Sequence, residues 1–323
     1  MKKDEYDLLI ISPLHFKNSL IKLKKHKNNF NIKTKLVSLK EIYNSNFVKI
    51  NPFDNVEKIK IFIKNAIEKW NIRYVLLVGG DKQLPVRYIH NFDVYPADPS
   101  IKEPPYISDL YYADIHNSKG EFSRWTSKNN GKYGEWNGKE AQDKNIDLKP
   151  DICIGRLPCK NVIELKIVIN KIINYETNKN EKSWFKNIVA VGGNTHPEYG
   201  EKRGGEIDIN NALSYMKDFN KIKIFASKGN LNRRNIIKSI NKGCGFLVLC
   251  GHGNLAYWTT YKDDNKDLIP KFSLNHMKLL SNRNKPPICI ASGCRNSAFD
   301  CRPINFLKHP HLSYYWMDSA SKC

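Results

Sequence analysis

The chain has 323 residues, 41% of them hydrophobic and 11% aromatic, and a formal net charge of +21 at pH 7. This composition excludes an intrinsically disordered chain, and the length suits one large α/β domain or two smaller ones. No apolar run approaches the roughly 20 residues that a membrane-spanning helix needs, so no membrane span is expected.

The basic excess comes from 53 Lys and Arg residues against 32 Asp and Glu residues. Such an excess can indicate a nucleic-acid partner. The lysines are scattered along the chain, however, and many stand beside Asn and Ile. This distribution is typical of compositional drift rather than of a selected basic patch, so nucleic-acid binding is not the favoured interpretation.

The first half of the chain alternates strand-like and helix-like segments. Apolar residues at 56–70 recur with a period near 3.6, which predicts an amphipathic helix, and the apolar run at 74–80 predicts a buried parallel strand. A Gly-, Ser-, Asn- and Lys-rich segment at 117–149 is expected to be an exposed loop. The remaining predictions are strands at 7–12, 35–39, 109–115 and 152–155 and a helix at 161–177.

The second half repeats this alternation after a polar stretch at 178–183, which is typical of a linker. Strands are predicted at 187–192, 222–226, 245–250 and 287–291, and helices at 208–219, 233–241 and 275–280. Strands that alternate with helices favour a mainly parallel sheet with helices on both faces. We therefore expect an α/β protein with two subdomains, residues 1–177 and 183–323.

Two apolar strands of the second half end in a potentially reactive side chain among small residues: His252 follows the strand at 245–250, and Cys294 follows the strand at 287–291. Ligands bind past the carboxyl ends of parallel strands, so we expect these side chains to face one another there. A histidine can take the proton of a thiol during attack and later protonate the leaving amine. The N–H group of Cys294 or that of Gly253 is the expected oxyanion donor, and the absence of a side chain at Gly251 and Gly253 would let a substrate backbone approach.

Structural roles for these residues are the competing interpretation. A histidine after a strand is more often structural than catalytic, and cysteines inside apolar runs, as at Cys153, Cys250 and Cys289, are typical of a core. Cys294 differs because it follows its apolar run and lies among small and polar residues. A zinc site built from Cys250, His252 and Cys294 is disfavoured because no second close pair of ligands occurs, and no metal site is predicted.

Several motifs resemble the gingipain-type cysteine peptidases of the caspase-like clan. The histidine and the cysteine are 294 − 252 = 42 residues apart, similar to the separation of about 50 in caspases, although the caspase signature around the cysteine is absent. The resemblance runs from about residue 7 to about residue 300. Its motifs are the segments 37–43, 71–81, 84–87, 108–114 and 150–158 and the two strand ends that carry His252 and Cys294.

The resemblance implies a caspase-like α/β sandwich in two subdomains, a Cys–His dyad in the second, and endopeptidase activity on polypeptide substrates. It also implies cleavage after a basic residue, which would need an unpaired carboxylate in the substrate pocket. The candidates are the loop acids Glu198, Glu201 and Glu206, because Asp208 and Asp218 are expected to belong to a helix. Some family members bind calcium, a property that we assign to no residue. An acid assists the histidine in the family, and Glu201 and Glu206 both lie in the corresponding loop, as candidates between which the sequence does not choose.

The sequence departs from the family pattern after the cysteine. Only 323 − 294 = 29 residues follow Cys294, without a clear α/β pattern, whereas family members continue with more strands. A catalytic subdomain truncated at its end is therefore expected, and the alternative function is an inactive caspase-like module that binds polypeptides. The N-terminus has no secretory apolar region, so the expected location is the cytoplasm, or outside the cell after processing.

Overall fold

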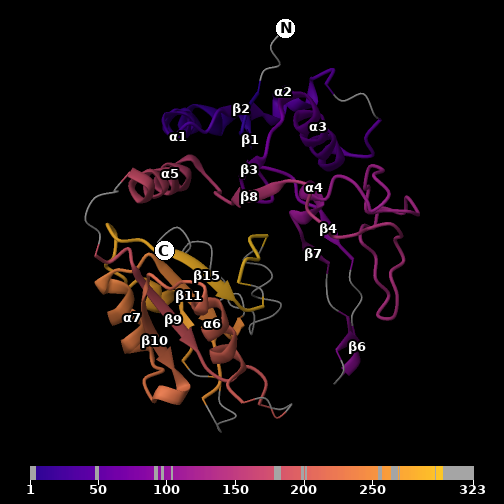
Figure 1. Cartoon of the computed structure of the whole chain (residues 1–323). Coiled ribbons are helices and arrows are strands. Elements are labelled where there is room, and N and C mark those ends of the chain that lie inside the picture. Colours follow the sequence, from indigo (N-terminus) through magenta and orange to yellow (C-terminus); the bar gives the residue numbers. More distant parts are fainter. Residues whose placement is uncertain are drawn as a thin grey trace. The chain divides into compact units, whose positions relative to one another are not determined.

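The computed structural model describes residues 5–47, 51–90, 94–95, 98–102, 105–177, 183–197, 200, 202–253, 257–262, 268, 270–294 and 296–300. The chain divides into two compact units, Met1–Ile169 and Asn170–Cys323 (Figure 1). This division falls inside one helix, α5 (Val162–Thr177). The predicted linker begins where that helix ends, and residues 178–182 lie outside the described part of the chain.

The first unit is built on a parallel four-stranded sheet in the order β2-β1-β3-β8. Its strands are β1 (Leu8–Ser12), β2 (Thr34–Ser38), β3 (Tyr74–Val78) and β8 (Cys153–Leu157). Its helices are α1 (Lys17–Asn29), α2 (Leu39–Tyr43), α3 (Asn55–Trp70) and α4 (Leu110–Ala113). Two short antiparallel pairs complete it, β4 (Tyr88–Ile89) with β7 (Tyr106–Ile107) and β5 (Val94–Tyr95) with β6 (Asp98–Lys102). The predicted helix at 56–70 and the strand at 74–80 are confirmed.

Two predictions for this unit are wrong. Residues 110–113 form the single turn of α4 rather than a strand, because a short apolar run carries no periodicity that separates the two. The segment 117–149 is only partly exposed: Trp125 and Tyr133 are buried in the core of the unit, and Trp125 Nε1 donates a hydrogen bond to Asp114 Oδ2 at 2.9 Å. The mostly polar composition of this segment predicted exposure, although its aromatic residues Trp125 and Tyr133 pack into the core.

Arg156 of β8 connects its own sequence motif, 150–158, with three others in the first unit. Its side chain is 4% exposed and forms a double hydrogen bond with Asp109, from Nε to Oδ2 at 2.6 Å and from Nη2 to Oδ1 at 2.7 Å. It also donates to the carbonyl oxygens of Gly79 at 2.8 Å and Leu84 at 3.2 Å. One planar guanidinium therefore holds the turn before α4 and the loop after β3 against β8, a geometry that an ammonium cannot reproduce.

We expect Arg156→Lys to lower the free energy of unfolding by about 2 to 4 kcal/mol, because several buried acceptors lose their donor. Urea unfolding followed by tryptophan fluorescence measures this loss. The matched control is Arg73→Lys, which changes an arginine bound to Asp7 with a side chain that is 70% exposed. Exposed pairs contribute little, so the control should unfold like the wild type. Equal midpoints for both variants would contradict the prediction.

The second unit contains another parallel four-stranded sheet, in the order β10-β9-β11-β15. Its strands are β9 (Asn187–Gly192), β10 (Asn220–Phe225), β11 (Phe246–Cys250) and β15 (Ile288–Ser292). Its helices are α6 (Gly204–Ser214), α7 (Arg233–Lys242) and α8 (Leu274–Met277). A small antiparallel sheet follows β11 and consists of β12 (His252–Gly253), β13 (Tyr257–Thr259) and β14 (Phe272–Ser273).

Alternate residues of β9 pack against different helices. Val189 and Val191 lie in one cluster with Ile236 and Ile240 of α7. Ile188 and Ala190 of the same strand lie in another cluster, together with Ile209 and Leu213 of α6. Because side chains alternate across a strand, α6 and α7 cover opposite faces of the sheet. The predicted α/β class, with mainly parallel sheet and helices on both faces, is confirmed (Figure 1).

Candidate active site

The segments that follow β11 and β15 lie in contact at the carboxyl ends of these two parallel strands. The two strands are paired up to Cys250 and Ser292, and the N–H of Gly251 donates to the carbonyl oxygen of Ser292 at 3.1 Å. Beyond this point, a Cβ placed on Gly293 would lie only 3.1 Å from the backbone nitrogen of Gly253. The structure therefore brings the segments that carry His252 and Cys294 together.

His252 is held by a third strand end. Its Nε2 lies 2.5 Å from the carbonyl oxygen of Thr195, in the loop that follows β9. A carbonyl oxygen can only accept a hydrogen bond, so Nε2 carries the proton and Nδ1 is the nitrogen left to accept one. The rings of His196 and Tyr261 pack edge-to-face on the imidazole, with centroids 5.3 and 5.5 Å away. The ring orientation is thus determined from several sides.

Thr195 is fixed in turn by its neighbour Asn194. The backbones of Asn194 and Tyr261 exchange two hydrogen bonds of 3.0 Å each, and Thr260 Oγ1 donates to the Asn194 carbonyl oxygen at 2.9 Å. The sequence prediction placed candidate acids in this loop but missed the role of Thr195. Its signal was available, because Thr195 follows an apolar strand and two glycines, as His252 follows a strand and one glycine.

The cysteines singled out in the sequence differ in solvent exposure. Cys294 is exposed and His252 is partly buried. Cys250 is buried, as predicted, among the residues that pack against α6. The prediction that Cys153 belongs to the core is wrong: it is exposed, because β8 pairs with β3 at the end of its sheet. Cys289 is intermediate in exposure.

The glycines around His252 are required by the packing of the chain itself. A Cβ on Gly251 would lie 2.4 Å from the carbonyl oxygen of Thr259, and one on Gly253 would lie 2.2 Å from Oδ1 of Asn296. The space that we had expected a substrate backbone to use is therefore filled by the protein. Packing within the chain, rather than the approach of a substrate, therefore accounts for Gly251 and Gly253.

An acid that assists His252 stays a prediction. Glu206 is 4% exposed and accepts hydrogen bonds from the N–H and the hydroxyl of Ser227, at 2.9 and 2.5 Å. Those bonds attach the start of α6 to the turn after β10. Glu201 lies outside the described residues.

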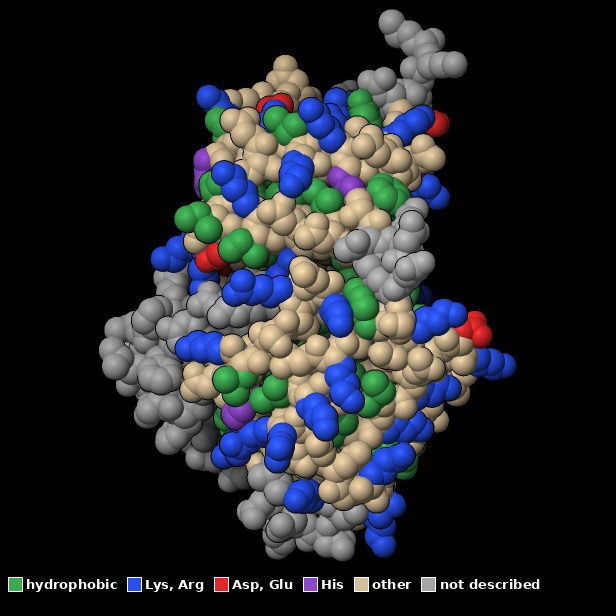
Figure 2. All heavy atoms as spheres, turned by 90° about the vertical axis from the view of Figure 1, so that its left-hand side faces the viewer, with side chains coloured by type: hydrophobic (Ala, Val, Ile, Leu, Met, Phe, Trp, Pro, Cys, Tyr) green, Lys and Arg blue, Asp and Glu red, His purple; other side chains and the backbone are tan. Residues whose placement is uncertain are grey.

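Among the residues that the structure describes, no three His, Cys, Asp or Glu side chains are grouped so as to hold a metal ion. The same part of the chain contains no helix long and apolar enough to cross a membrane. Figure 2 shows Lys and Arg side chains spread over the visible face and separated by other side chains.

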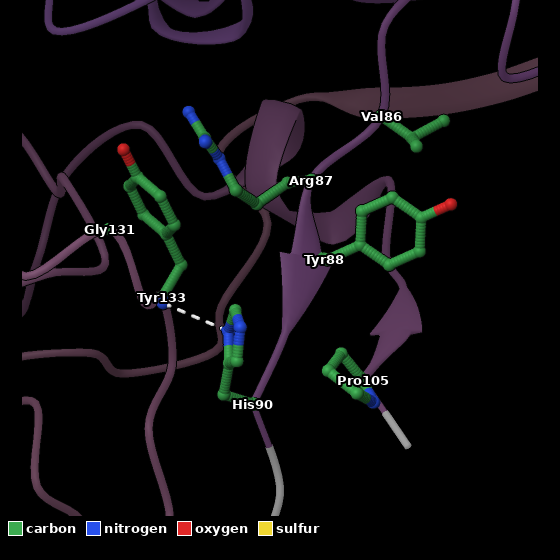
Figure 3. A pocket seen from close by; sticks show the side chains of 7 residues that line it. All are labelled: Val86, Arg87, Tyr88, His90, Pro105, Gly131 and Tyr133. Carbon is green, nitrogen blue, oxygen red and sulfur yellow. Dashed lines mark hydrogen bonds between the residues drawn. The ribbon is translucent and has the colours of Figure 1, made fainter.

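A pocket of about 440 Å³ lies in the first unit, lined by Arg87, Tyr88, His90 and Tyr133 among others (Figure 3). Arg87 is bound at both Nη atoms by Asp54, at 2.7 and 2.9 Å, and its guanidinium lies 3.6 Å from the centroid of the Tyr133 ring. This arginine is therefore already paired. The pocket contains neither His252 nor Cys294.

The fold of the chain is that of a known class of cysteine proteinase. All of the chain matches the crystal structure of the Arg-specific cysteine proteinase gingipain R, with a TM-score of 0.66 at 20% sequence identity, and covers 60% of that structure's chain. A structure described as that of a protease matches 92% of this chain and 54% of its own, with a TM-score of 0.61 at 15% identity. The expected caspase-like α/β fold is confirmed.

The model of peptidase family C25 matches residues 2–322. This chain belongs to peptidase family C25, which confirms the gingipain-type resemblance. Gingipain R2 of Porphyromonas gingivalis is 24% identical over 246 residues, which are 75% of this chain and 26% of that protein. Gingipain R1 of the same species has the same identity over 20% of its length. The chain thus spans about a quarter of the length of these curated relatives.

Proposed function

We propose that this chain is the catalytic region of a cysteine endopeptidase, with Cys294 as nucleophile and His252 as general base and acid. The observation that carries the proposal is the contact between the two strand-end turns. The hydrogen bond from His252 to Thr195 supports it, because it leaves Nδ1 to accept the thiol proton. The exposure of Cys294 supports access of a polypeptide to the nucleophile.

In this proposal His252 Nδ1 takes the proton of Cys294 as the sulfur bonds to the scissile carbonyl carbon. The negative charge that develops on the carbonyl oxygen is stabilised by the N–H groups of Cys294 and Gly253. His252 then gives its proton to the leaving amine, and the peptide bond breaks to leave a thioester. Water, deprotonated by His252, hydrolyses the thioester and restores the thiol.

A basic residue on the amino side of the cleaved bond is the substrate preference that we propose. Its support is the description of the similar solved structure as an Arg-specific proteinase. Of the loop acids that could form the required carboxylate, Glu198 and Glu201 lie outside the described residues. Glu206 is engaged by Ser227.

Alkylation with iodoacetamide tests the catalytic pair without a known substrate. A free thiol is only a few per cent ionised at pH 7, so pairing with His252 should speed labelling of Cys294 by about 30-fold over the His252→Ala variant. Cys153 is exposed in the other unit and provides an internal reference within the same protein. Peptide mapping by mass spectrometry gives both rates. Equal labelling of Cys294 in the two forms would remove the proposal.

A further inference from the structure

Asn296 lies two residues after the proposed nucleophile and has an unusual environment. The residue as a whole is partly exposed, but both amide atoms, Nδ2 and Oδ1, are buried and have no hydrogen-bond partner among the described residues. Buried side-chain amides are rarely left unpaired, and the exceptions call for an explanation. Burying both the NH₂ group and the oxygen of an amide without hydrogen bonds lowers the stability of the fold. This cost indicates that the Asn296 side chain serves a purpose other than stability.

The amide fills the space between the two turns of the site. A Cβ on Gly253 would lie 2.2 Å from Asn296 Oδ1, and a Cβ on Gly293 would lie 2.6 Å from Asn296 Nδ2. The two glycines stand directly beside His252 and Cys294 in the sequence. A planar amide is thin enough to lie against both glycines, and it touches the histidine turn and the cysteine turn at once.

We propose that Asn296 is a positioning residue, which sets the separation of His252 and Cys294 by occupying the space between Gly253 and Gly293. The proposal deepens the proposed function, on which its catalytic meaning rests. Small displacements of a catalytic group reduce rates strongly, so loss of this spacer should weaken the pairing of thiol and imidazole while both residues remain. Asn296 acts in this way through the two turns and without contact to the substrate.

A double-mutant cycle tests the spacer. Gly293→Ala forces the amide to move, because of the 2.6 Å approach, whereas in an Asn296→Ala background only the milder backbone contacts of the new Cβ remain, at 3.1 Å from the Gly253 nitrogen and 3.2 Å from the His252 carbonyl carbon. Each single variant should lower the His252-dependent alkylation rate of Cys294 by about fivefold, and the double variant should lose no more than either. Losses that multiply to about 25-fold would overturn the proposal. Cys153 again supplies the reference rate within each variant.

A second variant keeps the test decisive if Gly293→Ala fails to fold. Asn296→Asp has the same shape and adds a negative charge beside the pair, so the pH midpoint of Cys294 alkylation should rise by about one unit. The matched control is Asn211→Asp, at an exposed position of α6, which should leave the midpoint unchanged. An unmoved midpoint in Asn296→Asp would contradict the proposal, since it would mean that the side chain does not lie beside the pair and has only a structural role.

The two possible failures are distinguishable. If His252→Ala does not slow the alkylation of Cys294, the proposed catalytic pair itself is wrong. If His252 dependence is intact but the cycle is multiplicative, or the midpoint does not move in Asn296→Asp, only the role of Asn296 is wrong.

Discussion

Replacing Cys294 by alanine is expected to lower the rate of peptide-bond hydrolysis by about 10⁴-fold or more, since alanine has no sulfur that could form the thioester beside His252. His252→Ala should have a loss of similar size, and the double variant should lose little beyond either single one, because residues that act as a unit are not additive. Incubation of each form with a peptide library, followed by mass spectrometry of the new termini, measures the loss.

The matched control for this experiment is Cys153→Ala, which removes an exposed thiol in the first unit and should hydrolyse the library like the wild type. Wild-type cleavage after Lys or Arg would support basic specificity, and cleavage after Asp or Asn would contradict it. Hydrolysis that persists in Cys294→Ala would exclude this cysteine as the nucleophile. If the wild type binds peptides of the library but cuts none, the inactive binding module becomes the better description.

Lys60→Met is expected to remove a pH dependence of stability that amounts to about 4 kcal/mol between pH 7 and 10.5. Lys60 belongs to α3, is fully buried, donates to the carbonyl oxygen of Ser123, and places Nζ 4.2 Å from the centroid of the Tyr111 ring. Burial lowers the pKa of Lys60 from 10.5 to about 7, against the opposing attraction of Asp114. The charged groups that act on it are Asp114, Arg87, Glu57 and Asp151.

The sign follows from where the proton is bound. Between pH 7 and 10.5 the unfolded chain holds a proton on Lys60 and the folded chain does not, so the free energy of unfolding rises with pH by up to about 1.4 kcal/mol per unit. Methionine has a similar volume and does not titrate. Urea unfolding at a series of pH values should therefore show a slope in the wild type that the variant lacks.

Lys69→Met, at an exposed position of the same helix, is the matched control and should keep the wild-type slope, because it retains Lys60. Parallel curves for the wild type and Lys60→Met would show that this buried lysine is not the source of the pH dependence. The comparison is between slopes, so a uniform change in stability from the altered packing around α3 does not affect it.

The sequence by itself determined the elements that depend on local patterns. The period of α3, the apolar runs of β3, β9, β11 and β15, and the α/β class were predictable because hydrophobic spacing reports which side chains an element buries. His252 and Cys294 were predictable as a candidate pair, because both follow buried strands and parallel strands end at the same edge of a sheet. The motifs around Asp109 and Arg156 supported the family, although their contact was not foreseen.

Only the tertiary structure decided which groups surround that pair. Thr195 reaches His252 because β9 lies beside β11, and Asn296 lies against Gly253 because β15 lies on the other side of β11. Strand order is set by packing over the whole unit and leaves no mark in the local pattern of any one strand. For the same reason the burial of Trp125 within a polar segment, and the helical turn of α4, were decided by the core that they join rather than by their own sequence.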